Sequence, residues 1–240
     1  MQKILISDYD QTFYLNDEDI EKNKKYINKF IELGNLFVIA TGRSYLDFHN
    51  KLDIYKFNYN YVILNHGATV IDKNNNVLFN ICISNEIISN IQKDLNLDEC
   101  VNYFCCSKTD SRVTFEHKDL TKINVRYNSK DYALDKANYI NDKYGNYVNA
   151  YYVNTNSIEI ISNKTSKAKA IYWLIKFCNF VKESNIYVIG DGYSDIEMVK
   201  EFNGYCMKDS VEELKKIANK EYDSVSDLVN DILNYSVDIY

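Results

Sequence analysis

Three short apolar runs near the N-terminus constrain the fold of this chain more than any other feature. They lie at residues 4–6, 36–40 and 61–64, and segments with helical spacing of apolar residues separate them. A run without polar alternation is typical of a strand that is buried on both faces, and such strands form parallel sheets covered by helices. The sequence therefore predicts an α/β protein with a Rossmann-like parallel sheet.

The middle of the chain has a different pattern of predicted helices and strands. After residue 82 the pattern predicts a helix, at least two strands, a second helix over 130–144 and a hairpin formed by 147–153 and 157–161, which is an α+β arrangement. The α/β texture returns after residue 162, with a strand at 186–189 and helices at 166–180, 194–202, 211–218 and 225–234. We therefore expect a core formed by residues 1–81 and 162–240, and an inserted α+β cap domain formed by residues 82–161.

The composition of this 240-residue chain limits the kinds of partner that we expect it to bind. Its net charge is −6 and it has no run of basic residues, so we expect no nucleic-acid partner. No apolar run approaches the roughly 20 residues of a membrane span, and no signal peptide is visible, so we expect no membrane partner. None of the six cysteines forms a Cys-x-x-Cys pair, which indicates reduced thiols and a cytoplasmic location. We expect a monomer or a small homo-oligomer.

Two carboxylates, Asp8 and Asp10, follow the first apolar run directly. Like charges this close repel each other, so the pair suggests a divalent metal ion, a nucleophile, or both. Three further sets of polar residues should lie at the same edge of the sheet, because each follows a strand or begins a helix. They are Thr41-Gly42-Arg43, Lys167, and Asp191 with Asp195. Carboxylates suit Mg²⁺, a hydroxyl suits phosphate oxygens, and a lysine neutralises developing charge. The set predicts a phosphoryl-transfer site.

These segments also carry a family resemblance. In chain order, they resemble the four motifs of the haloacid dehalogenase (HAD) superfamily, and the chain is most similar to its Cof-type sugar-phosphatase branch. The matching segments are Asp8-Tyr9-Asp10-Gln11-Thr12, Thr41-Gly42-Arg43, Asn163-Lys164-Thr165-Ser166-Lys167 and Gly190-Asp191-Gly192-Tyr193-Ser194-Asp195. In addition, His66-Gly67-Ala68 resembles an Asn-Gly-Ala signature of that branch. The resemblance covers essentially the whole chain and places a C2-type cap between the second and third motifs.

The resemblance implies a phosphoric monoester hydrolase that uses Mg²⁺ and acts on a small phosphorylated metabolite, most simply a sugar phosphate. It makes Asp8 the nucleophile that forms an aspartyl-phosphate and Asp10 the general acid and base. It gives Lys167 the role of holding Asp8 and the phosphate. Substrate binding falls to Thr41, Gly42 and Arg43, and metal binding to Asp8, the Asp10 carbonyl, Asp191 and Asp195.

Three positions depart from the family pattern. Gln11 stands where a glycine is usual, so a tight turn must tolerate a side chain. Ser194 replaces a common Asn, and Lys208-Asp209 replaces a usual Gly-Asn near the metal. Gln11 and Lys208-Asp209 leave open a weakly active regulatory protein that binds a phosphorylated metabolite. A phosphomutase of the same fold also stays open, since a capped relative of this type moves phosphate between sugar hydroxyls.

Overall fold

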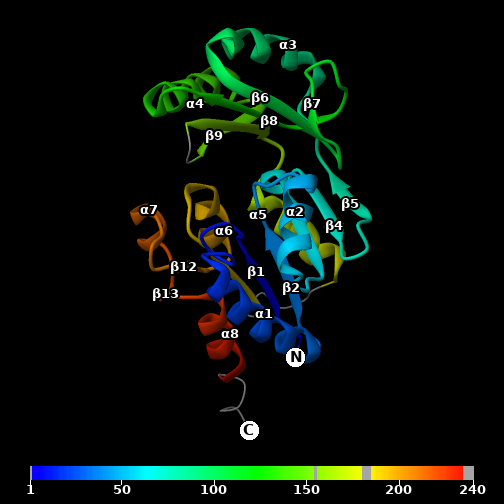
Figure 1. Cartoon of the computed structure of the whole chain (residues 1–240), viewed down its shortest axis with the longest axis vertical. Coiled ribbons are helices and arrows are strands. Elements are labelled where there is room, and N and C mark those ends of the chain that lie inside the picture. The colour runs from blue at the N-terminus through cyan, green and yellow to red at the C-terminus, as the bar shows by residue number, and fades with distance from the viewer. Residues whose placement is uncertain (1, 154–155, 180–184, 235–240) are drawn as a thin grey trace.

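The computed structural model describes residues 2–153, 156–179 and 185–234. These residues form two β-sheets, one above the other in Figure 1, each with its own helices and its own apolar core. The larger sheet has the strand order β13-β12-β11-β1-β2-β3-β4-β5, and the smaller one has the order β7-β6-β8-β10-β9. The predicted α/β core and α+β cap thus correspond to two separately packed layers.

The larger sheet is parallel from β13 to β3, and its last two strands, β4 and β5, are antiparallel. Its strands are β1 (Ile4–Ser7), β2 (Leu36–Ala40), β3 (Tyr61–Leu64), β4 (Thr69–Asp72), β5 (Val77–Asn80), β11 (Ile186–Gly190), β12 (Tyr205–Met207) and β13 (Glu221–Tyr222). Its helices are α1 (Asp17–Glu32), α2 (Tyr45–Tyr55), α5 (Lys167–Phe177), α6 (Ile196–Glu201), α7 (Glu212–Lys215) and α8 (Val225–Asn234).

Successive residues of the central strands pack on opposite faces of this sheet. Leu5 packs with α1, α2 and α8, while its neighbours Ile4 and Ile6 pack with α5, α6 and α7. Both sets are fully buried. This is why the apolar runs show no polar alternation, and it leaves the carboxyl ends of the strands as the open edge of the core.

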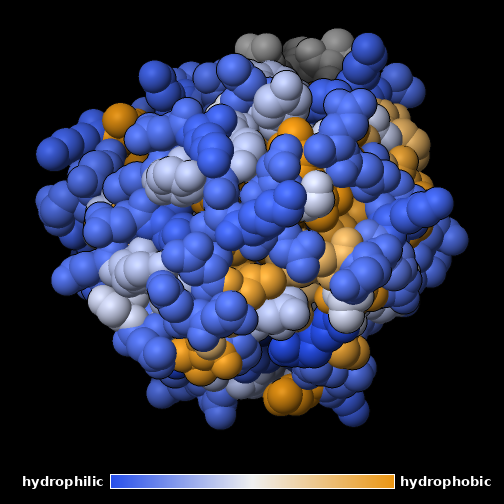
Figure 2. Space-filling model, turned by 90° about the horizontal axis from the view of Figure 1, so that it is seen from above, coloured by the Kyte–Doolittle hydropathy of each residue, from blue (hydrophilic) through white to orange (hydrophobic). Residues whose placement is uncertain are grey.

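The smaller sheet is antiparallel and carries α3 (Asn85–Asp94) and α4 (Lys130–Tyr144) on the face away from the core. Its strands are β6 (Cys100–Ser107), β7 (Ser111–Val113), β8 (Leu120–Tyr127), β9 (Val148–Val153) and β10 (Ser157–Ser162). Alternation is clear here: Ile123 and Ile158 pack under the helices, whereas Lys122 and Glu159 lie on the opposite face, toward the larger sheet. Viewed from above, the outer surface of this layer is mostly hydrophilic, with scattered apolar side chains (Figure 2).

Asn16 caps α1, because its side chain accepts from the backbone N–H groups of residues 18 and 19. Some local predictions needed correction. The strands β12 and β13 were not predicted, and α7 is only four residues long. A helix was expected over residues 166–180, and residue 180 lies outside the described residues. Among the described residues, no helix has the combined length and apolar character needed to cross a bilayer.

Candidate active site

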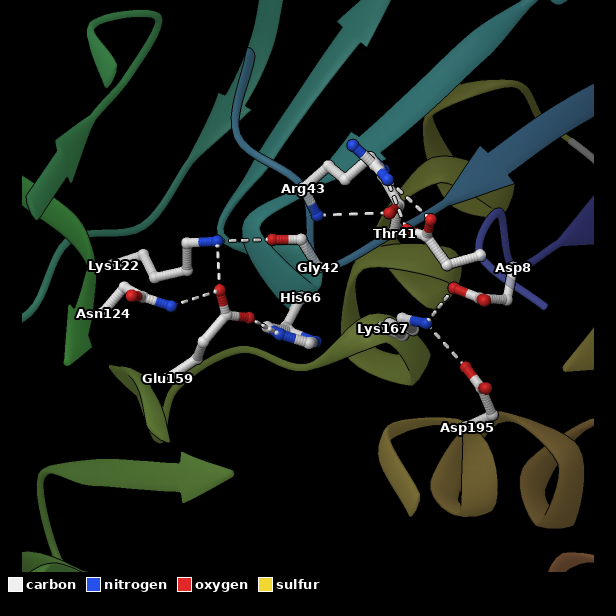
Figure 3. A network of polar contacts seen from close by, with 11 residues as sticks. Asp8, Thr41, Gly42, Arg43, His66, Lys122, Asn124, Glu159, Lys167 and Asp195 are labelled. Carbon is white, nitrogen blue, oxygen red and sulfur yellow. Dashed lines mark hydrogen bonds and ion pairs between the residues drawn. The ribbon is translucent and has the colours of Figure 1, made fainter. Parts of the chain in front are cut away.

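Lys167 joins two of the predicted acids at the floor of the site. Its ammonium Nζ lies 2.6 Å from Asp8 Oδ1 and 2.6 Å from Asp195 Oδ1 (Figure 3). Asp8 continues the parallel ladder, since its N–H donates to Ile189 O at 2.9 Å. Lys167 is the first residue of α5, which Ser166 caps by accepting from the N–H of residue 169. The end of β1 and the start of α5 therefore fix this contact through the backbone.

Asp191 completes a group of three carboxylates. Carboxylate oxygens of Asp8, Asp191 and Asp195 lie within 4.8 Å of one another. Thr12 orients Asp191 by donating to its Oδ1 at 2.8 Å, and Asp195 Oδ2 accepts from the backbone N–H groups of Asp191 and Gly192. Both Asp195 oxygens are thus engaged, so it positions the turn that carries Asp191.

The charges of this group do not balance. Burial raises the pKa of Asp8 well above its usual value, and Asp195 and Asp191 raise it further against the opposing effect of Lys167. Burial and the nearby Asp195 raise the pKa of Asp191 to about 6. Lys167 itself keeps its charge: burial lowers its pKa, but the two carboxylates raise it more. One lysine among three acids leaves an excess of negative charge, and a divalent cation with oxygen ligands would fit it.

Thr41, Gly42 and Arg43 form the turn after β2. Thr41 is buried, and its Oγ1 accepts from the Arg43 N–H at 3.1 Å, which leaves the hydroxyl proton free to donate. The Arg43 guanidinium binds both oxygens of Asp10, with Nε 2.8 Å from Oδ2 and Nη2 2.6 Å from Oδ1. The Asp10 carboxylate is therefore separate from the three-carboxylate group, and the metal contact predicted for this residue concerns its backbone carbonyl, a different atom.

The departures from the family pattern have local consequences. Gln11 adopts a left-handed backbone with φ of 60°, a conformation that suits glycine, and its side chain is exposed. Lys208 turns away from the site to pair with Asp223 at 2.6 Å, whereas Asp209 lines the cleft. None of these positions removes a group from the predicted chemistry.

The sequence prediction missed the contribution of the smaller sheet. Lys122 of β8 donates to Gly42 O at 2.6 Å and to Glu159 Oε1 at 2.7 Å. Glu159 of β10 accepts from Asn124 and is hydrogen-bonded through Oε2 to His66 Nε2 at 2.5 Å (Figure 3). Only the strand alternation pointed to these residues, because it placed polar side chains opposite the apolar face of β8 and β10.

Between the two sheets lies a cleft of about 700 Å³. Asp8, Lys167 and the Thr41 turn line it on the core side, and His66 and Tyr151 are among the residues toward the cap. The structure thus brings all eight predicted site residues to one cleft, while their roles stay predictions. The cleft is large enough for a small organic phosphate.

Comparisons with known proteins agree with this architecture. The sequence pattern of a family described as haloacid dehalogenase-like hydrolase matches residues 5–137 and 106–230. A protein of Buchnera aphidicola subsp. Baizongia pistaciae, named "Putative phosphatase", is 26% identical, and the match covers 97% of this chain and 98% of that protein.

Solved structures share the fold. A haloacid dehalogenase-like hydrolase from B. subtilis superposes with a TM-score of 0.83 at 15% identity, covering 95% of this chain and 99% of that one. A haloacid dehalogenase-like hydrolase from Bacteroides thetaiotaomicron gives a TM-score of 0.78 at 17% identity, with 97% and 100% covered. The arrangement of core and cap is therefore one that this chain shares with proteins of distant sequence.

Proposed function

Because this chain belongs to the haloacid dehalogenase-like hydrolase family, we propose that it is a Mg²⁺-dependent phosphatase acting on a small phosphorylated metabolite, a sugar phosphate in the simplest case. The observation that carries the proposal is the contact of Asp8 with Lys167 at the floor of the cleft, beside Asp191 and Asp195. The name of the relative from Buchnera supports the phosphatase part of this proposal.

Asp8 is the nucleophile of the proposed reaction. Lys167 holds Asp8 Oδ1, which leaves the second carboxylate oxygen to attack phosphorus. A bond forms between that oxygen and phosphorus while the bond to the leaving oxygen breaks. Thr41 donates a hydrogen bond from its hydroxyl to a phosphoryl oxygen, and Lys167 offsets the negative charge that develops.

Asp10 moves the protons. It gives one to the leaving oxygen, then takes one from a water molecule that attacks the aspartyl-phosphate and releases inorganic phosphate and Asp8. Arg43 pairs with both Asp10 oxygens, and each oxygen keeps a second lone pair that can carry a proton. If the substrate phosphate draws Arg43 away from Asp10, Arg43 takes the anion-binding role that the sequence predicts for it.

Asp8 and Asp191, with the Asp10 carbonyl, would hold Mg²⁺, and Asp195 would support them. The raised pKa values of Asp8 and Asp191 support this assignment, since they reflect negative charge that Lys167 alone does not offset. When bound, the ion would lower these pKa values and screen the phosphate from the carboxylates.

The test uses purified full-length protein and p-nitrophenyl phosphate. We expect hydrolysis that requires Mg²⁺, stops on chelation and is abolished by Asp8→Asn. Asp223→Asn, on the surface, is the matched control and should keep its activity. Hydrolysis that survives Asp8→Asn refutes the mechanism. With a sugar phosphate as substrate, release of free phosphate supports a phosphatase, whereas an isomerised sugar phosphate identifies a mutase.

A further inference from the structure

The turn at residues 41–43 has each of its carbonyl oxygens held. In the core, the backbone N–H groups of residues 66 and 65 donate to Thr41 O at 3.0 Å and to Arg43 O at 2.9 Å. Gly42 O, between them, accepts from the Lys122 ammonium of β8 at 2.6 Å (Figure 3). A side chain of the cap therefore holds the middle of a turn that the core carries.

Lys122 is both buried and charged. Its side chain is 2% exposed, and its ammonium also donates to Glu159 Oε1 at 2.7 Å. Burial alone would lower the pKa of Lys122, but the charge of Glu159 and the hydrogen bond to it raise this pKa above its usual value. Hydrogen bonds from a charged donor are stronger than those between neutral groups. The ammonium therefore fixes the Gly42 carbonyl more firmly than a neutral side chain would.

The peptide group between Gly42 and Arg43 carries this contact to Thr41. A trans peptide group is planar, and its C=O and N–H point in opposite directions. Here the C=O accepts from Lys122, and the N–H, which belongs to Arg43, donates to Thr41 Oγ1 at 3.1 Å. An ammonium on the carbonyl polarises the peptide group, so its N–H becomes a stronger donor. Lys122 thus acts at one end of a rigid unit whose other end orients the Thr41 hydroxyl.

The cap must sit over the turn for these contacts to exist. Lys122 and Glu159 both belong to the smaller sheet, whereas Gly42 and His66 belong to the larger one. The turn lies directly against the hydrogen-bonded pair of Glu159 and His66, because a Cβ on Gly42 would collide with the His66 ring. The geometry of the turn therefore depends on the place of the cap.

We propose that Lys122 is a positioning residue for phosphoryl transfer, and that it orients the Thr41 hydroxyl toward the substrate phosphate through the peptide group between Gly42 and Arg43. Thr41 lines the same cleft as Asp8. The cap then completes the phosphate-binding turn in addition to covering the cleft. The inference rests on the proposed phosphatase function and assigns part of its phosphate site to the cap.

The first experiment isolates the contact with Gly42. Lys122→Met alone would leave Glu159 as a buried charge without its cation, so both charges are removed together. Full-length Glu159→Gln is compared with Glu159→Gln/Lys122→Met, with p-nitrophenyl phosphate and Mg²⁺, after a cooperative urea transition has shown that each is folded. We expect kcat/KM to be about tenfold lower without Lys122, which is less than the roughly 10²-fold loss of a donor that contacts the reacting oxyanion directly.

The same comparison in a Thr41→Val background separates positioning from a general effect on the fold. Valine has nearly the shape of threonine but lacks the hydroxyl. If Lys122 acts through that hydroxyl, its removal should now change kcat/KM by less than about twofold. An equal tenfold fall in both backgrounds overturns the proposal, because Lys122 then acts by another route.

Asn124→Ala is the matched control in the cap. Asn124 lies on the same strand as Lys122 and donates to the same Glu159 oxygen, at 3.1 Å. We expect its kcat/KM to stay within about twofold of wild type. A fall as large as that caused by removing Lys122 overturns the proposal, since it would trace the loss to Glu159. If Glu159→Gln/Lys122→Met does not fold, Glu159→Gln/Lys122→Gln, with a shorter and uncharged side chain, makes the same comparison.

Binding of inorganic phosphate, measured by calorimetry with Mg²⁺, gives a readout that needs no turnover. We expect Glu159→Gln/Lys122→Met to bind phosphate several-fold more weakly than Glu159→Gln, and equal affinities overturn the role of Lys122. Phosphate binding that depends on Lys122, in a protein that hydrolyses no p-nitrophenyl phosphate, overturns the proposed function and supports the role of Lys122 in the turn. Hydrolysis by the wild type with equal kcat/KM in the two variants overturns the role of Lys122 and supports the phosphatase.

Discussion

Replacing Lys167 with Met tests the charge balance at the floor of the site. Met preserves most of the length and the apolar stem but removes the ammonium that lies 2.6 Å from both Asp8 and Asp195. The Lys167 side chain is 2% exposed and that of Asp195 is 1% exposed. The variant therefore leaves two buried carboxylates without their cation.

The expected loss of stability is large for a single substitution. Removing one partner of a buried ion pair costs about 3–5 kcal/mol, because the remaining charge stays desolvated. Asp8 can take up a proton, since burial already raises its pKa, and this reduces the loss. We therefore expect Lys167→Met to lower the free energy of unfolding by about 3 kcal/mol at pH 7. The value of kcat should also fall, by roughly 10²-fold or more, as for the loss of one donor at a reacting oxyanion.

Urea unfolding followed by circular dichroism measures the stability change in a buffer with chelator. Lys169→Met is the matched control, because Lys169 lies in the same helix turn, is exposed, and its Nζ donates to a backbone oxygen, Asn163 O, at 2.7 Å and not to a buried carboxylate. We expect the control to change stability by less than about 0.5 kcal/mol. If Lys167→Met is within about 1 kcal/mol of Lys169→Met, the charge argument for this site is wrong.

Four further substitutions address the backbone and the cap. Gln11→Gly should raise the free energy of unfolding by about 0.5–1 kcal/mol, because φ is 60°; no rise in the urea midpoint would contradict this. Gly67→Ala should cost more than about 2 kcal/mol, because its Cβ would lie 2.1 Å from Ser166 O, whereas Gly34→Ala, with open space, should cost only about 1 kcal/mol; equal losses would refute the steric reason. Glu159→Gln should lower stability by about 2 kcal/mol at pH 7. Burial alone would raise the pKa of Glu159, but in the folded protein this pKa is lowered. The carboxylate therefore stabilises the fold above its unfolded pKa of about 4.5, and this stabilisation is lost on acidification. If the difference in unfolding free energy between wild type and Glu159→Gln does not narrow between pH 5.5 and pH 3.5, the argument is contradicted.

The sequence predicted the larger elements well because their signals are local. The helix α4 has the predicted bounds, and the hairpin of β9 and β10 is within one residue of its predicted bounds, since turn residues and caps mark their ends. The strands β12 and β13 have three and two residues, too few for any periodicity, and they form only because β11 offers an edge with which to pair. Their existence depends on the assembled sheet.

The residues of the site also fall into a group that the sequence could predict and a group that it could not. Asp8, Thr41 and Asp191 were predictable because the carboxyl ends of neighbouring parallel strands meet at one edge. Alternation along β8 and β10 shows that Lys122 and Glu159 lie opposite the apolar core of the cap. It cannot show that they reach Gly42 and His66, because that depends on how the smaller sheet sits over the larger one.

The two sides of the cleft differ in charge, and this difference suggests that they have different roles. On the core side, three carboxylates face one lysine, and this excess of negative charge fits the divalent cation that we propose for the site. On the cap side, Lys122 and Glu159 cancel and His66 is neutral, so little net charge remains to attract a second anion. Changes to the net charge of the cap side should therefore alter which ester is hydrolysed.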